Sequence, residues 1–335
     1  MEDWIRNLPK LDLHLHLDGS LRLDTLKELA SALPDDRRFA EDLDLAKAVT
    51  PPTRCSLEEY LRSFDYTVAV LQDEAALERA ALELCEDAAS EHVIYLEIRF
   101  APLLHTECGL SPREVVTAVL AGLRRAEDRF DLHARLILSA MRNESRERSV
   151  EVAQLAAQFR KKGVVGFDLA GPEHDYPPFL HKTAIGFARD VGLHLTLHAG
   201  EGCCPEQIRE AIDLGAERIG HGLYLDHDPS TLKRVVSEGI PLELCPTSNL
   251  QISGRMERYA DHPFGAYFEQ GIRVTVNTDN RLMSQTSSTR ELQAMVDAFD
   301  LAPDDVHRIL QHSVDAAFCD DETRDVVQRR LDAAF

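Results

Sequence analysis

The sequence lacks a membrane-length apolar segment and an excess of basic residues. No window approaches the roughly 18 consecutive apolar residues of a membrane span. The opening residues, MEDWIRNLPK, carry acids early and have no apolar core, so we expect no signal peptide. Lysine and arginine total 37 against 58 aspartates and glutamates, a net charge of −21. This charge argues against nucleic acid or an anionic membrane as a partner, but it is compatible with a small neutral ligand.

A regular cysteine framework is also missing. Seven cysteines, at positions 55, 85, 108, 203, 204, 245 and 319, are scattered along the chain without a CxxC pair. This usage is typical of reduced thiols, so we predict a cytoplasmic protein. We interpret the adjacent Cys203 and Cys204 as small apolar packing residues. The motifs HExxH, GxxxxGKS/T and GxGxxG are absent too, so nothing in the sequence indicates their zinc, phosphate or dinucleotide sites.

What the sequence does contain is a series of short apolar runs separated by helical patterns. The runs span residues 10–16, 92–100, 133–140, 163–170, 192–199, 218–222, 240–246 and 272–278. Most are rich in Val, Ile and Leu, as in strands of a parallel sheet buried on both faces. Eight strands that alternate with helices predict an α/β fold of the (β/α)8 TIM-barrel type, with a doubly wound sheet as the alternative.

Helix starts and connection lengths support this architecture. Capping boxes are predicted at Ser56 with Glu59 and at Ser111 with Glu114, and a helix is predicted from Pro205 to Gly215. The stretch 17–91 is too long for one connection, so it should hold extra helices that cover one mouth of the barrel. We find no linker or repeat and expect one domain over residues 1–335.

Candidate metal ligands lie where these strands end. His14 and His16 stand two apart in LDLHLHLDGS, so their side chains share one face of a strand. His198, His221 and Asp279 end three further runs, in LHAGE, RIGHG and VNTDN. Active-site residues of a barrel gather at these carboxyl ends, and histidine with carboxylate is a natural zinc set. We therefore predict a zinc site, although any one of these residues alone would more often be structural.

A single metal ion is favoured over two. Two-metal sites commonly need a further bridging ligand, such as a carboxylated lysine at the end of the fourth strand. Here that strand ends in DLAGPE, and Lys161 and Lys162 precede it, at the opposite mouth. Glu201, three residues past His198, would lie beside the metal. Burial would raise its pKa enough for a general acid, although a helix-start glutamate is the structural alternative.

These motifs together resemble the adenosine deaminase family of metal-dependent amidohydrolases. The resemblance follows the chain in order through LHLHLDGSL, SLEEYLRSFDY, VVGFDLAGPE, LHAGE, RIGHGL, LCPTSN and NTDN. It implies a zinc-bearing (β/α)8 barrel that hydrolyses adenosine and 2′-deoxyadenosine to inosine and 2′-deoxyinosine with release of ammonia.

The resemblance also implies a role for each site residue. One zinc ion per chain would be bound by His14, His16, His198 and Asp279. Glu201 would protonate N1 of the purine, while His221 would orient and help to ionise the zinc-bound water and Asp279 would accept a proton from it. The substrate contacts would come from His16, from Asp18 at the ribose hydroxyls, from the Gly171 N–H at N3, from Asn280 at N7, and from Leu57, Tyr60, Leu61 and Phe64 as an apolar helix face.

Asn280 departs from the two consecutive aspartates that are frequent in the family. An amide donates to N7 at any pH, whereas a carboxylic acid donates only when protonated. The alternatives are another 6-aminopurine, such as free adenine or a modified nucleoside, and a binding or signalling protein on an inactive barrel. AMP is disfavoured, because Arg22 is the only base near DGSLR and no basic cluster marks a phosphate site. The sequence predicts no oligomeric state.

Overall fold

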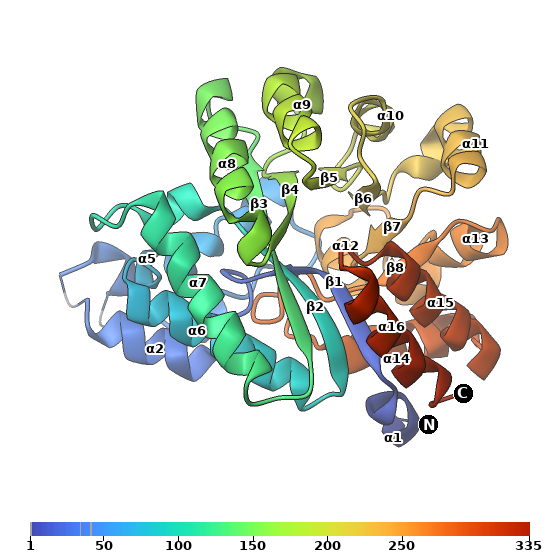
Figure 1. The fold of residues 1–335 in the computed structure, drawn as a ribbon, viewed down its shortest axis with the longest axis horizontal. Helices are drawn as coiled ribbons and strands as arrows, with labels where there is room; N and C mark the ends of the chain where they lie inside the picture. Colours follow the sequence, from blue (N-terminus) through green and yellow to red (C-terminus); the bar gives the residue numbers. More distant parts are fainter. Residues whose placement is uncertain (1, 34, 41) are drawn as a thin grey trace.

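The computed structural model describes residues 2–33, 35–40 and 42–335. Within these ranges, eight parallel strands pair in sequence order into one barrel sheet (Figure 1). Their bounds are β1 Lys10–His16, β2 Val93–Phe100, β3 His133–Met141, β4 Val164–Ala170, β5 His194–Ala199, β6 Arg218–His221, β7 Leu242–Leu244 and β8 Val274–Val276. Each strand overlaps one predicted apolar run, and the predicted (β/α)8 barrel is confirmed.

The segment that follows β8 meets β1 and completes the ring. Leu15 forms a parallel bridge with Asp279. The His16 N–H donates to the Asp279 carbonyl at 2.7 Å, and the Asp279 N–H donates to the His14 carbonyl at 2.8 Å. This pairing places Asp279 beside His14 and His16, although more than 260 residues separate them in the chain.

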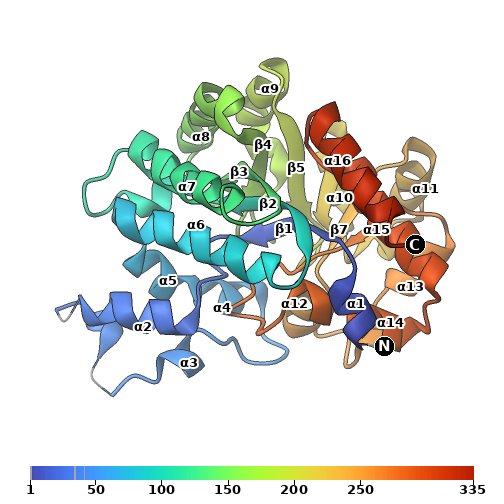
Figure 2. The ribbon, with the colours of Figure 1, turned by 60° about the horizontal axis from the view of Figure 1, so that its bottom comes forward.

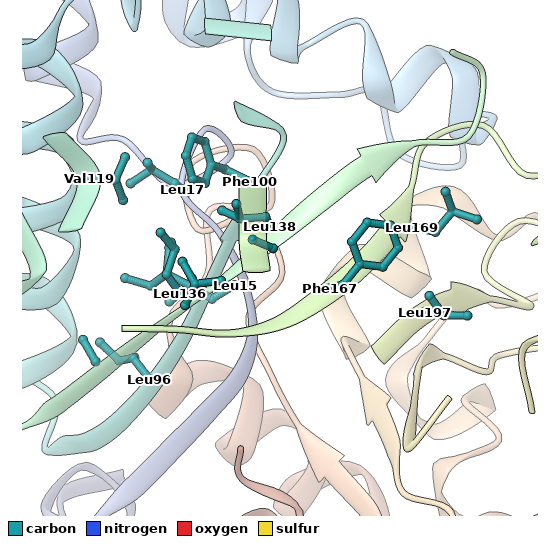
Figure 3. Close-up of a cluster of buried hydrophobic side chains, with 14 of the residues drawn as sticks. Leu15, Leu17, Leu96, Phe100, Val119, Leu136, Leu138, Phe167, Leu169 and Leu197 are labelled. Atoms are coloured by element: carbon teal, nitrogen blue, oxygen red, sulfur yellow. The ribbon is translucent and has the colours of Figure 1, made fainter. Parts of the chain in front are cut away.

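The two faces of the sheet differ in chemistry. Outward side chains such as Leu15, Leu136 and Phe167 form an apolar layer beneath the helices (Figure 3). The interior instead holds charged residues, for example Arg218, which pairs with Glu97 and Glu243 across the barrel. The predicted burial of the strands on both faces is confirmed, and the interior face tolerates charged side chains because they pair with one another.

Helices surround the barrel as the alternation predicts (Figures 1 and 2). The helices between successive strands and near the C-terminus are α6 Glu74–Ala89, α7 Pro112–Glu127, α8 Arg146–Phe159, α9 Lys182–Asp190, α10 Pro205–Asp213, α11 Pro229–Glu238, α13 Phe264–Glu269, α14 Ser288–Phe299, α15 Pro303–Ala316 and α16 Asp321–Asp332. The short helix α1 Glu2–Asn7 precedes β1. Both predicted capping boxes form, at α4 Leu57–Leu61 and at α7. Helix α10 ends at Asp213, with Leu214 as its C-cap and Gly215 directly after it in a left-handed backbone.

The long connection after β1 holds the extra helices that its length predicts. They are α2 Leu23–Ser31, α3 Leu45–Ala48, α4 Leu57–Leu61 and α5 Phe64–Val70, and they gather on one side of the barrel (Figure 2). Helix α12, Pro246–Ile252, follows β7 and contributes Ile252 to a small apolar cluster with Leu57 and Tyr60 of α4. Among the described residues, no helix is long and apolar enough to cross a membrane.

Candidate active site

A cavity of about 430 Å³ opens at the carboxyl ends of the strands. Most of the predicted site residues line it: His16, Asp18, Tyr60, Leu61, Phe64, Gly171, His198, Glu201, Asp279 and Asn280. His14 and His221 are fully buried beside this group, with ring centroids 4.7 Å apart. Leu57 packs behind the lining with Tyr60. The structure thus gathers residues from five strand ends and from the two short helices Leu57–Leu61 (α4) and Phe64–Val70 (α5) around one space.

Four side chains converge as ligands of one metal ion would. His16 Nε2 lies 3.3 Å from His198 Nε2 and 3.4 Å from Asp279 Oδ1. His14 Nε2 lies 3.5 Å from the same Asp279 oxygen and has no hydrogen-bond partner in the described structure. Ligands about 2.0–2.1 Å from a tetrahedral zinc lie roughly 3.3–3.4 Å from one another. The donor set and its spacing therefore fit a zinc ion.

Two carboxylates behind this cluster orient its imidazoles. The Nδ1–H of His14 donates to Glu243 at 2.8 Å, and that of His198 donates to Asp168 at 3.0 Å. Each Nε2 is then left with a free lone pair, as a metal ligand requires. Burial raises the pKa of Asp168, but its contacts with His198 and Arg99 outweigh this effect and hold that pKa below its usual value.

Sequence reasoning assigned no role to Asp168 or Glu243. Their signal is present, because each is an acid inside an otherwise apolar strand, at VVGFDLA and IPLELCP. A buried charge in such a strand needs a partner. The sequence could not show which histidine each acid meets, because those contacts depend on strand pairing and on which face of each strand points inward.

Glu201 sits in a loop that another carboxylate organises. The backbone N–H groups of Gly200, Glu201, Gly202 and Cys203 all donate to the Glu173 carboxylate. Glu201 is buried, and its Oε1 lies 3.5 Å from Nε2 of His221. Burial and the negative charge of Asp279 raise the pKa of Glu201 well above its usual value. A carboxyl group in this setting holds a proton that it can donate to a ligand.

The adjacent cysteines of this loop differ from their prediction. Cys203 and Cys204 form a disulfide, so describing them as reduced packing residues was wrong. The other five cysteines are free thiols. The pairing depends on the turn before α10, where Cys204 has a left-handed backbone with φ of 63°. Sequence spacing does not reveal that backbone conformation.

The opposite side of the cavity is built around Asn280. A Cβ atom added to Gly19 would lie 1.8 Å from Asn280 Oδ1, so the glycine allows the amide to sit where it does. The Tyr60 hydroxyl lies 2.9 Å from the Ser284 hydroxyl. Tyr60 therefore brings a hydrogen-bonding group to a helix face that was predicted as apolar. Gly171, with φ of 103°, needs the left-handed backbone that glycine tolerates.

The outer part of the cavity carries mixed charge. Asp18 Oδ2 faces His105 Nε2 at 3.6 Å. Two arginines, Arg38 and Arg62, line the rim together with the acids Glu58, Asp65 and Glu107. Arg38 is already paired with Asp36 at 2.7 Å. Arg22, the base close to the DGSLR motif in the sequence, pairs with Glu86 and Asp87. Arg38 and Arg62 reach the rim instead, because the chain folds back and brings the end of α4 and the 37–39 turn there.

Two site residues have a backbone conformation that is unusual for side-chain-bearing residues. His221 has φ of 65° and Asp279 has φ of 58°. Left-handed backbone at a residue other than glycine costs energy and tends to occur at functional sites. Both residues aim their side chains at the ligand cluster from the carboxyl end of a strand.

Comparison with known proteins agrees with this geometry. The adenosine deaminase family model matches residues 9–334. An adenosine deaminase of Enterococcus faecalis is 38% identical over 339 residues, which span 100% of this chain and 99% of the relative. The crystal structure of Arabidopsis N6-mAMP deaminase is 31% identical, with a TM-score of 0.90 and 99% of each chain covered.

A third relative is an amidohydrolase from Burkholderia ambifaria, whose crystal structure has bound Zn. It is 25% identical, with a TM-score of 0.87, and the match covers 99% of this chain and 93% of that one. The family resemblance in the sequence is therefore confirmed over nearly the whole chain. The chain belongs to the adenosine deaminase family of hydrolases.

Proposed function

We propose that this protein is a zinc-dependent hydrolase that deaminates adenosine and 2′-deoxyadenosine to inosine and 2′-deoxyinosine. The observation that carries the proposal is the convergence of His14, His16, His198 and Asp279 beside the buried Glu201. A binding protein on an inactive barrel has no use for a protonated acid beside a complete ligand set. Free adenine or a modified nucleoside is the alternative substrate.

Zinc in this cluster would supply a Lewis acid that brings the pKa of a coordinated water from about 15.7 towards about 7. Protonated Glu201 donates its proton to N1 of the purine, which withdraws electrons from C6 as water adds there. Asp279 accepts the proton that the water releases. The C6 amino group then takes up the proton held by Asp279 and leaves as ammonia, while the C6 hydroxyl returns a proton to Glu201 and inosine remains. Glu201, Asp279 and Asn280 are themselves buried, so bulk water competes little for these hydrogen bonds.

The remaining lining groups hold the purine on its other edges. In this proposal the Gly171 N–H faces N3, the Asn280 amide faces N7 and the Asp18 carboxylate accepts from a ribose hydroxyl. Phe64 and Leu61 cover the ring with apolar surface. Sites built around donors discriminate strongly against analogues that lack the matching acceptor.

A nucleoside suits the rim better than a nucleotide. Glu58, Asp65 and Glu107 place three acids there against Arg38 and Arg62, and Asp36 already neutralises Arg38. A phosphate dianion would meet net negative charge on entry. The Arabidopsis relative is named an N6-mAMP deaminase, which makes a nucleoside monophosphate the competing class of substrate. Among the rim residues that the structure describes, Arg62 favours that class.

A substrate panel tests the proposal directly. Purified protein is assayed for ammonia release from adenosine, 2′-deoxyadenosine, adenine, AMP and N6-methyl-AMP, with matched reactions that contain a chelator. We expect adenosine and 2′-deoxyadenosine to be turned over fastest, and chelated reactions to be silent. If AMP or N6-methyl-AMP is turned over faster than adenosine, the substrate is a nucleotide. If adenine is turned over faster than adenosine, the substrate is the free base.

A further inference from the structure

A chain of hydrogen bonds links the backbone N–H of Phe264 to the ring of His221 through His262 and Asn249. The Phe264 backbone N–H can only donate, and it donates to His262 Nδ1 at 3.0 Å. His262 Nε2 must then carry the proton, and it contacts Asn249 Oδ1 at 3.2 Å. Burial lowers the pKa of His262 to about 3, in keeping with a neutral ring.

A second backbone N–H, that of Cys245, independently fixes the orientation of the Asn249 amide. The Cys245 N–H also faces Asn249 Oδ1, at 3.3 Å. With its oxygen held by two donors, Asn249 presents its Nδ2–H groups to His221 Nδ1 at 3.0 Å. Flipping the amide would set a donor against both Cys245 and His262. Because Asn249 is fully buried, those clashes would have no water to relieve them.

We infer that Asn249 and His262 are positioning residues that hold the proton of His221 on Nε2, so that His221 donates a hydrogen bond into the active site. A nitrogen that bears this proton neither binds a metal nor accepts a proton. The inference deepens the proposed function and rests on it for the catalytic meaning of the donor. The tautomer itself follows from the contacts alone.

The contrast with the other histidines of the cluster supports this assignment. His14 and His198 each turn Nδ1 towards a carboxylate, so their Nε2 atoms are free to bind a metal. His221 turns Nδ1 towards an amide donor, so its Nε2 holds hydrogen and lies 3.5 Å from Glu201. These three rings all point Nε2 towards the cluster, and the residue behind each ring sets whether that nitrogen is free or protonated.

This assignment narrows the set of metal ligands. Three groups of side chains in the described structure bring ligand atoms within 4.8 Å of one another, and two of these groups include His221. The group that omits it is His14, His16 and Asp279, which His198 Nε2 joins at 3.3 Å from His16. In the proposed reaction, His221 would then orient the attacking water by donation, and proton acceptance would fall to Asp279.

Nitrogen-15 NMR of histidine-labelled, zinc-loaded enzyme tests the inference without an activity assay. The His221 signals are assigned by their loss in His221→Gln. We expect a protonated Nε2 and an unprotonated Nδ1 in the wild-type protein. The opposite pattern, or a metal-bound Nε2, would overturn the inference whatever the enzyme's substrate is.

Asn249→Asp supplies the matched perturbation. An aspartate has the same shape but only accepts, so it should move the His221 proton to Nδ1. In serine proteases the reverse change, from aspartate to asparagine behind the catalytic histidine, lowers kcat about 10⁴-fold through the wrong tautomer. We expect a loss of kcat here of about a hundredfold or more, with KM little changed and zinc retained.

A control variant separates the effect of the His221 tautomer from a general disturbance of the buried hydrogen bonds. His262→Gln keeps an N–H donor towards Asn249 Oδ1 and should stay within a few-fold of wild-type kcat. If Asn249→Asp shifts neither the His221 nitrogen signals nor kcat, Asn249 does not set the tautomer. If wild-type enzyme shows the expected tautomer but deaminates no purine, the proposed function fails while the hydrogen-bond assignment stands.

Discussion

Gly19→Ala tests how the base is recognised, because the change acts on one defined neighbour. The new Cβ would lie 1.8 Å from Asn280 Oδ1, 2.6 Å from its Cγ and 2.9 Å from its Cβ. Moving only the tip of the side chain cannot relieve all three contacts, so the whole Asn280 side chain must shift. Gly19 does not have positive φ, so alanine adds no backbone strain of its own.

The expected loss follows from the hydrogen bond that this shift breaks. When the Asn280 amide moves away, N7 of the purine is left without a hydrogen-bond donor, which costs about 1–3 kcal/mol. This cost corresponds to a fall in kcat/KM for adenosine of about 5- to 150-fold. 7-Deazaadenosine has no acceptor at that position, so Gly19→Ala should slow it much less. Steady-state ammonia release with both substrates measures the two ratios.

A double-mutant cycle provides the control for this prediction. In an Asn280→Ala background the amide is gone and only the 2.9 Å contact with Cβ remains, so adding Gly19→Ala should change adenosine turnover much less. Equal losses on adenosine and 7-deazaadenosine would show that Asn280 does not contact N7. A Gly19→Ala enzyme that stays within twofold of wild type on adenosine would refute the steric argument itself.

Three further predictions concern the acid and the barrel interior. Glu201→Gln should keep the fold and the metal but lose about 10²–10⁴-fold in kcat, because an amide cannot deliver a proton; more than a tenth of wild-type kcat would contradict the acid role. Since burial and the Asp279 charge raise the pKa of Glu201, and the protonated form is the active one, kcat should fall as pH rises through that pKa; the residual activity of Glu201→Gln should lack this alkaline limb in a pH–rate profile. Glu243→Gln should lower the free energy of unfolding, measured by urea denaturation, by about 3–5 kcal/mol, because it leaves the buried Arg99 and Arg218 without their shared carboxylate. A change below about 1 kcal/mol would show that the interior charges are not coupled in this way.

Much of the fold could be predicted because its signals are local. Each strand is a short apolar run, and capping residues such as Ser56 and Ser111 mark where helices start. The strand-end histidines could be identified because a parallel barrel brings all carboxyl ends to one mouth. Those two regularities were enough to predict that His14, His16, His198, His221 and Asp279 lie together, and the family resemblance then implied which four of them would bind the metal.

The supporting contacts could not be predicted, because they join residues far apart in the chain. Asn249 lies in the helix after β7, whereas His221 ends β6. Glu173 lies in the segment after β4, whereas the Glu201 loop that it binds follows β5. Residue type alone leaves such partners undetermined. The Cys203–Cys204 pairing was missed for a related reason, since it depends on local backbone conformation.

Metal reconstitution with adenosine as substrate tests the central claim most directly. The purified protein is stripped with a chelator, titrated with zinc, and followed at each step by metal analysis and ammonia release. We predict that the stripped protein is inactive and that activity rises linearly to a plateau at one zinc ion per chain. Full activity in metal-free protein, or a plateau that needs two tightly bound ions per chain, would contradict this account.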